Sequence, residues 1–112
     1  MSNLENAVRM PPPDWPDVHH SEFHVVGGIR WHVQRQGTGP TLLLVHGTGG
    51  STHSWAGSTP VLAAHFHLVS IDLPGHGFTQ VPAEVERRRN PYALAAMSRA
   101  VGELLTHLGE RP

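Results

Sequence analysis

The most constraining feature of this sequence is a short apolar run, Thr41-Leu42-Leu43-Leu44-Val45, which a glycine-rich stretch follows directly. An apolar run of this length is typical of a strand that is covered on both faces, as in a parallel sheet. Parallel strands need crossover connections, and these are usually helices. The run therefore predicts an α/β fold class for the segment around it.

The residues after this strand continue in a strand–helix pattern. A helix is expected over 54–65, although Gly57 and Pro60 make its first half irregular. Residues 67–72 predict the next strand, which a right-handed parallel crossover would join to the first. A last helix is expected, with Asn90 as its N-cap and Gly109 as its end. Its apolar positions recur at spacings of three and four: Leu94, Met97, Val101, Leu104, Leu105 and Leu108.

The residues before the apolar run divide into an arm and a hairpin. Residues 1–20 are rich in proline, which cannot sustain a helix, so they predict an extended N-terminal arm. The Gly27-Gly28 turn joins two β-type segments and predicts a hairpin. Polar residues alternate with Ile29, Trp31 and Val33, which indicates a hairpin with one face in water. Residues 21–112 are thus expected to form the folded part of the chain.

The composition excludes several classes of function. The chain has no cysteine, which removes disulfides, thiolate metal sites and a cysteine nucleophile. Its net charge of −1 gives no reason to expect a nucleic-acid partner. The N-terminal residues lack the basic and apolar regions of a signal peptide, and no apolar run is long enough to form a transmembrane segment. By default, the sequence predicts a cytoplasmic protein.

The glycine-rich stretch Val45-His46-Gly47-Thr48-Gly49-Gly50-Ser51-Thr52-His53-Ser54-Trp55 has three candidate chemistries. A phosphate-binding loop is disfavoured, because neither the P-loop spacing nor the dinucleotide-binding glycine pattern fits. A metal site is disfavoured as well, because no carboxylate stands at ligand spacing beside the two histidines. We therefore expect neither a cofactor nor a metal. The third candidate is a loop that stabilises the oxyanion of acyl transfer through backbone N–H groups.

The third candidate is supported by the resemblance of this stretch to a loop of a known protein family. A buried strand that ends in His-Gly and leads through small residues into a helix resembles the oxyanion loop of α/β-hydrolases. The resemblance implies backbone donors at Thr48 and Gly49, with His46 and Gly47 supporting the loop. A histidine at a strand end more often braces a loop than takes part in catalysis.

A second motif, Asp72-Leu73-Pro74-Gly75-His76-Gly77-Phe78-Thr79, resembles the loop after the fourth strand of the same superfamily. Asp72, Gly75 and Gly77 are then expected to shape the rim of the site. Together the two motifs imply that residues 21–112 are the N-terminal half of an α/β-hydrolase domain. The fold would then be incomplete, with a β-hairpin followed by a parallel β-α-β-α unit. In that family's strand order, the strand at 41–45 would have one unpaired edge in this chain.

A closer resemblance covers most of residues 14–109. It rests on Asp14-Trp15-Pro16 and the segment 27–35, together with the two motifs already quoted, and it points to the α/β-hydrolase-type magnesium-chelatase accessory proteins encoded with bacteriochlorophyll genes. This resemblance implies a place in bacteriochlorophyll biosynthesis, with magnesium chelatase subunits as partners. It also implies a small-molecule ester or tetrapyrrole-related ligand.

No serine of the chain has the G-x-S-x-G surroundings of a hydrolase nucleophile, and the acid and histidine of a triad are not evident. The nucleophile, acid and histidine are therefore expected beyond Pro112, so that this chain is an N-terminal portion of a longer protein. Three possibilities stay open at this stage: part of a serine-type hydrolase, a non-catalytic accessory factor that binds porphyrin or chelatase, and a truncated product without function.

Overall fold

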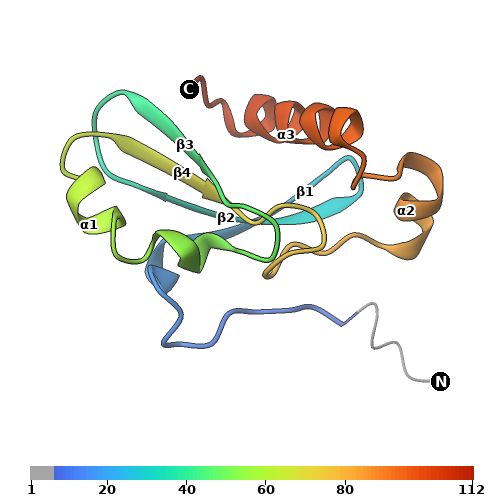
Figure 1. The fold of residues 1–112 in the computed structure, drawn as a ribbon, viewed down its shortest axis with the longest axis horizontal. Coiled ribbons are helices and arrows are strands. Elements are labelled where there is room, and N and C mark those ends of the chain that lie inside the picture. The colour runs from blue at the N-terminus through green and yellow to red at the C-terminus, as the bar shows by residue number, and fades with distance from the viewer. Residues whose placement is uncertain (1–6) are drawn as a thin grey trace.

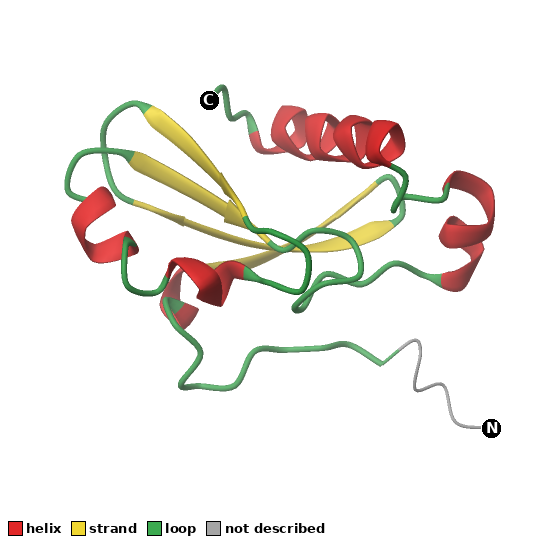
Figure 2. Cartoon of the chain, in the orientation of Figure 1, coloured by secondary structure: helices red, strands yellow, loops and turns green. Residues whose placement is uncertain are grey.

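The computed structural model describes residues 7–112, so the first six residues of the expected arm lie outside the described range. Figure 1 shows the path of the chain, and Figure 2 separates its helices from its strands. The elements in chain order are η2 (Val18–His20), β1 (Ser21–Val26), β2 (Ile29–Gln36), β3 (Thr41–Val45), η3 (Thr52–Trp55), α1 (Thr59–Leu62), β4 (His67–Ile71), α2 (Ala83–Arg89) and α3 (Leu94–Leu108).

The four strands form one mixed sheet in the order β1-β2-β4-β3. The hairpin β1–β2 is antiparallel, and β2 is also antiparallel to β4. The pairing of β3 with β4 is parallel, with Leu43 opposite Val69. The predicted hairpin and parallel β-α-β unit are both confirmed. The prediction that the strand at 41–45 lies at an edge of the sheet is confirmed as well.

One face of the sheet carries the hydrophobic core, and α3 covers it (Figure 1). The buried side chains of this core are Ile29, Trp31, Val33, Val69, Ile71, Val85, Ala100 and Leu104. The three- and four-residue spacing of the apolar side chains in α3 directs one stripe of that helix onto the strands. None of the helices within residues 7–112 is long and apolar enough to cross a bilayer.

The opposite face of the sheet is also covered, and here the sequence-based prediction of a solvent-exposed hairpin face is wrong. In Figure 1, η3, α1 and the N-terminal segment lie on this side. His32 and Gln34 belong to the polar face of β2, yet they are only 0% and 2% exposed. This burial results from tertiary contacts. Loops from elsewhere in the chain supply hydrogen-bond partners, so His32 and Gln34 are buried without being left unpaired.

The helical segment expected over 54–65 is divided into two short pieces. The 3-10 helix η3 begins after Ser51, whose hydroxyl accepts a hydrogen bond from the backbone N–H of His53. The helix α1 is a single turn with Pro60 near its start. Gly57 lies between the two pieces, and its backbone freedom favours the break there.

The predicted start of the last helix is wrong. Asn90 does not cap α3; it ends α2 in the left-handed conformation, with φ 40°. The helix α3 begins at Leu94 instead, after Ala93. Asparagine suits both an N-cap and a left-handed C-terminal position, so its presence alone does not distinguish a start from an end. The helix α2, which ends with Arg87–Arg89, is not among the elements predicted from the sequence.

An ion-pair network attaches the C-terminal end of α3 to the sheet. Arg35 Nη2 lies 2.6 Å from Glu22 Oε1, and Arg35 Nη1 lies 3.2 Å from Glu110 Oε2. His67 Nε2 is 2.8 Å from the same Glu110 oxygen. Burial opposes ionisation of Glu110, but the hydrogen bonds from His67 and Arg35 outweigh it and hold the pKa of Glu110 below its ordinary value. The hydrogen bond to Glu110 raises the pKa of His67 against the opposing effect of burial.

These shifts predict a pH optimum for the contribution of the network to stability. A carboxyl with a lowered pKa stabilises the fold fully above its ordinary value of 4.5, and this stabilisation is lost as the pH falls through the pKa of the folded state. The contribution of His67 is complete below 6.5 and is lost as the pH rises through its raised pKa. We expect the free energy of unfolding to fall by about 1 kcal/mol or less on the acid side and on the alkaline side of this optimum, because the pairs are partly exposed.

Urea unfolding across a pH series checks this prediction. The variant Glu110→Gln removes the charge that His67 and Arg35 share, so its stability should depend less on pH than that of the unchanged chain. If the two pH profiles have the same shape, the network does not contribute as described.

Candidate functional site

The loop that leaves β3, residues 46–51, is called the β3 loop here, and residues 72–79 after β4 are called the Asp72 loop. The two loops meet at the carboxyl ends of the paired parallel strands. His46 is 4% exposed and joins them. Its Nδ1–H donates to Gly47 O over 2.7 Å, and its Nε2 accepts from the N–H of Leu73 at 3.0 Å. Both ring nitrogens are occupied, which supports a role for His46 in bracing the loop.

The two backbone amides expected to act as donors differ in their surroundings. Thr48 is exposed, and its N–H meets no acceptor within residues 7–112. The N–H of Gly49 donates to His76 Nε2 at 3.1 Å. A 3.0 Å hydrogen bond from Gly50 N–H to Gly47 O closes a tight turn that contains the amides of Thr48 and Gly49. In this conformation, Thr48 presents a free donor, whereas Gly49 does not.

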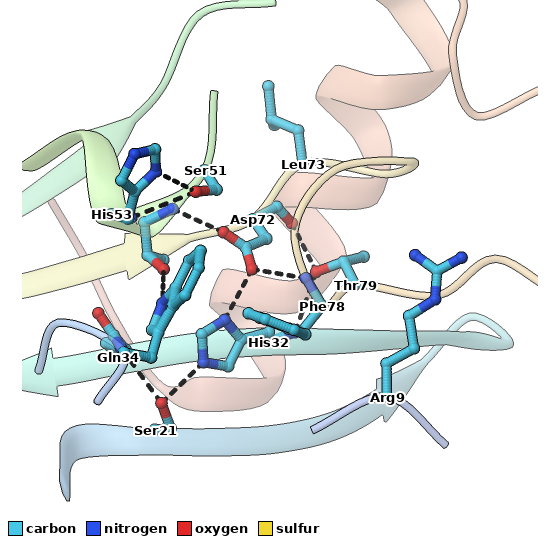
Figure 3. A network of polar contacts seen from close by, with 12 residues as sticks. Arg9, Ser21, His32, Gln34, Ser51, His53, Asp72, Leu73, Phe78 and Thr79 are labelled. Atoms are coloured by element: carbon cyan, nitrogen blue, oxygen red, sulfur yellow. Dashed lines mark hydrogen bonds and ion pairs between the residues drawn. The ribbon is translucent and has the colours of Figure 1, made fainter. Parts of the chain in front are cut away.

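Asp72 links the Asp72 loop to the segment that follows the β3 loop (Figure 3). Its side chain is completely buried. Asp72 Oδ1 accepts from the N–H of Thr52 at 2.7 Å, and Oδ2 accepts from the N–H of Phe78 at 2.9 Å. Burial alone would raise the pKa of Asp72, but the hydrogen bonds from His32, Phe78 and Thr52 outweigh it and lower that pKa. The ionised form of this buried carboxylate is therefore favoured, and it holds Phe78 in the Asp72 loop and Thr52 just after the β3 loop.

The imidazole of His32 continues this network toward β1, as Figure 3 shows. Its Nδ1–H donates to Asp72 Oδ2 over 2.7 Å, and Ser21 Oγ–H donates to its Nε2 over 2.7 Å. The order serine–histidine–aspartate is that of a catalytic triad. However, His32 is 0% exposed and packs against Phe23 and Phe78, so no substrate atom reaches its ring. We assign this arrangement to the support of the two loops.

Two glycines of the Asp72 loop are needed for their backbone conformation. Gly77 has φ 51°, and a Cβ there would overlap the carboxylate of Asp72. Gly75 has φ 79°, and a Cβ there would lie 2.8 Å from the ring of Tyr92. A side chain at either position would therefore be strained, which supports the expectation that the two glycines shape the loop.

The N-terminal segment also contacts the site. Trp15 Nε1–H donates to Thr52 Oγ1 over 3.1 Å, and its ring packs edge-on against Phe78 at 4.8 Å. Thr59 Oγ1–H donates to Asp17 Oδ2 over 2.7 Å. These contacts attach the arm to Thr52, to Phe78 of the Asp72 loop and to α1.

Sequence reasoning missed the roles of Trp15, Ser21, His32 and Thr52. Histidine at a polar position of β2 gave the one usable signal, because a strand neighbouring β4 can bring it to Asp72.

Residues 7–112 contain no group of three or more histidine or acidic side chains arranged to hold a metal. A cavity of about 240 Å³ is present, but none of the β3-loop residues lines it. It is bordered by Arg9, Gly75, Thr79, Gln80, Val81, Glu86 and Tyr92.

Comparison with known protein families gives a match over residues 40–112, to the family described as the alpha/beta hydrolase fold. This match covers both loops and more than half of the chain. The chain belongs to the α/β-hydrolase fold family. The recognition from the two sequence motifs and the predicted fold class are thereby confirmed.

Among curated relatives of this α/β-hydrolase chain, the magnesium-chelatase 30 kDa subunit of Rhodobacter capsulatus is 37% identical over 106 residues. That match includes 93% of this chain and 36% of the relative. Bifunctional epoxide hydrolase 2 of Mus musculus is 37% identical over 102 residues, which are 89% of this chain and 18% of that protein. The chain thus spans about a third or less of the length of these relatives.

Solved structures agree with the family assignment. Cfl2 from Burkholderia cenocepacia superimposes with a TM-score of 0.71 and 28% identity, over 80% of this chain and 29% of that one. The epoxide hydrolase VrEH1 from Vigna radiata gives a TM-score of 0.67 and 27% identity, over 82% of this chain and 28% of that chain. Within the α/β-hydrolase fold, the described residues therefore correspond to one part of the larger domains found in these proteins.

Proposed function

We propose that residues 46–55 form the oxyanion loop of a hydrolytic site that acts on a small-molecule ester or a tetrapyrrole-related ligand. The observation that carries the proposal is the free N–H of Thr48, which the structure presents at the carboxyl end of β3. An amide donor held in place before reaction stabilises the negative charge that develops on a carbonyl oxygen when a nucleophile attacks.

The support beneath Thr48 fits this chemistry. His46 braces the loop from one side, and the ionised carboxylate of Asp72 holds Thr52 at the other end. Because these hydrogen bonds exist before any ligand arrives, the donor needs little reorganisation during the reaction. The nucleophile, the acid and the histidine of the reaction would come from residues outside this chain.

We further propose that the protein acts beside magnesium chelatase in bacteriochlorophyll biosynthesis. The similarity to the magnesium-chelatase 30 kDa subunit of Rhodobacter capsulatus supports this proposal, because it extends over nearly all of the chain. The partners would be chelatase subunits and a tetrapyrrole-related ligand.

A chimaera tests the proposed site. The matching segment of the Rhodobacter capsulatus subunit is replaced by this chain, and the chimaera is assayed for hydrolysis of p-nitrophenyl esters and for support of magnesium insertion. The variant Thr48→Pro removes the N–H donor, and the backbone of Thr48 does not have a positive φ that would exclude proline. Thr48→Ala is the matched control, because it retains the N–H.

We expect Thr48→Pro to lower ester turnover by about 100- to 1000-fold, as the loss of one oxyanion donor does in other hydrolases. Thr48→Ala should retain turnover. If the chimaera hydrolyses no ester and both variants support magnesium insertion equally, the hydrolytic proposal is wrong and a non-catalytic accessory role is favoured.

A further inference from the structure

The β3 loop contains one amide whose donor is already occupied by a side chain. Gly49 has φ 82°, so its backbone orientation is fixed by a conformation that side-chain-bearing residues rarely adopt. Its N–H points at His76 Nε2 over 3.1 Å. That length is at the outer end of the range of about 2.7–3.1 Å expected between an oxyanion donor and the oxygen it stabilises.

The protonation of His76 is fixed by its second contact. His76 Nδ1 lies 3.1 Å from Pro74 O, and a carbonyl oxygen can only accept, so Nδ1 carries the proton. Nε2 accepts from the Gly49 N–H, and only an unprotonated ring nitrogen can accept, so the proton lies on Nδ1 alone in this contact. His76 Nε2 thus occupies the Gly49 N–H donor in this structure.

The neighbouring histidine is held differently. The ring centroids of His46 and His76 lie 4.9 Å apart. His46 is buried and joins the two loops, so its movement would disturb both of them. His76 is half-buried, and both contacts of its ring are made within the two loops at their surface. Rotation of the His76 side chain would release the Gly49 amide without any movement of the backbone.

We propose that His76 is a gating residue of the β3 loop: its neutral imidazole occupies the Gly49 donor until a ligand oxygen displaces it. The ligand class is a small oxyanion or the oxygen of a reacting acyl group. This inference rests on the proposed function, because it assumes that Thr48 and Gly49 form one donor pair. It goes further by assigning a role to a side chain of the opposite loop.

Titration of the 112-residue chain with inorganic phosphate tests the proposal without requiring a nucleophile. Amide resonances of Thr48 and Gly49 are followed in ¹⁵N-labelled protein at constant ionic strength, at a mildly alkaline pH where imidazoles in general are uncharged. The variant His76→Ala removes the competing acceptor. His65→Ala is the matched control, because His65 is exposed and makes no side-chain hydrogen bond within residues 7–112.

We expect phosphate to bind about threefold to tenfold more tightly at these two amides in His76→Ala, since one hydrogen bond no longer has to be displaced. His65→Ala should behave like the unchanged chain. His76→Gln, which restores an acceptor, should return the affinity toward the original value. Equal affinities in all four proteins would overturn the gating role while leaving the donor pair intact.

A response at neither amide in any of the proteins would instead overturn the donor pair and the gating role together. A direct measurement in the unchanged chain keeps the test independent of how the variants fold. A scalar coupling across the hydrogen bond between Gly49 N and His76 Nε2 should be detectable and should vanish at saturating phosphate. Its persistence at saturation would also overturn the proposal.

Discussion

Replacing Trp31 by alanine is expected to lower the free energy of unfolding by about 3–5 kcal/mol, the usual cost of removing a large aromatic side chain from a core. Trp31 is 0% exposed and lies among the side chains that join the sheet to α3. Its removal leaves a cavity that the paired strands β1, β2 and β4 cannot close by moving, because their register is fixed. Urea unfolding followed by circular dichroism measures the change.

The variant Trp31→Phe is the control that distinguishes lost volume from lost polarity. The indole N–H of Trp31 is buried and meets no acceptor within residues 7–112. A buried donor without a partner destabilises a fold by about 1–3 kcal/mol, and phenylalanine removes that donor. We therefore expect Trp31→Phe to cost much less than Trp31→Ala. Equal costs for the two variants would contradict this view of the core.

Secondary structure was predictable where a local pattern and its tertiary environment agree. The strand at 41–45 is apolar from Leu42 onward, and the structure gives it the predicted bounds. The stripe of leucines in α3 likewise identified that helix, because its spacing matches the helical period. Sequence failed where the tertiary environment decides, as at Asn90, whose backbone conformation depends on the turn between two helices.

In the candidate site too, sequence predicted what a local pattern determines and failed where distant residues meet. Glycines and histidine identified the β3 loop because its motif is continuous in sequence. The polar network behind it is not continuous: His32 and Asp72 are 40 residues apart, and Thr52 lies 20 residues from Asp72. Nothing local reveals such pairs, since the first depends on β2 lying beside β4 and the second on β3 lying beside β4 in the sheet. Sequence therefore predicted the loop and named His46 and Asp72 as its supports, but it missed His32 and Thr52 as the partners of Asp72.

The second large effect is expected at Asp72. Replacing it by alanine leaves the N–H groups of Thr52 and Phe78 and the Nδ1–H of His32 without their acceptor. Loss of one member of a buried charged network costs about 3–5 kcal/mol, so Asp72→Ala should destabilise the chain by this amount. Asp14→Ala is the matched control, because Asp14 is exposed and should cost little. Urea unfolding of both variants measures the difference.

Asp72→Asn separates the charge of this side chain from its shape. The amide can still accept from Thr52, but its nitrogen cannot accept from Phe78, so an intermediate loss of stability is expected. The lowered pKa of Asp72 adds stability above its ordinary value of 3.8, and this contribution is lost as the pH falls through the pKa of the folded state. Asp72→Asn should therefore remove that part of the acid sensitivity. An unchanged acid profile would show that the carboxylate is not held ionised by these bonds.

Amide hydrogen exchange connects this stability effect to the proposed site. If Asp72 holds the β3 loop in place, Asp72→Asn should speed exchange at Thr52 and Phe78 more than at Val69, which lies in the core strand β4. Equal acceleration at all three amides would indicate a loss of global stability only. Faster exchange confined to the loops would show that one buried carboxylate keeps the Thr48 donor in position.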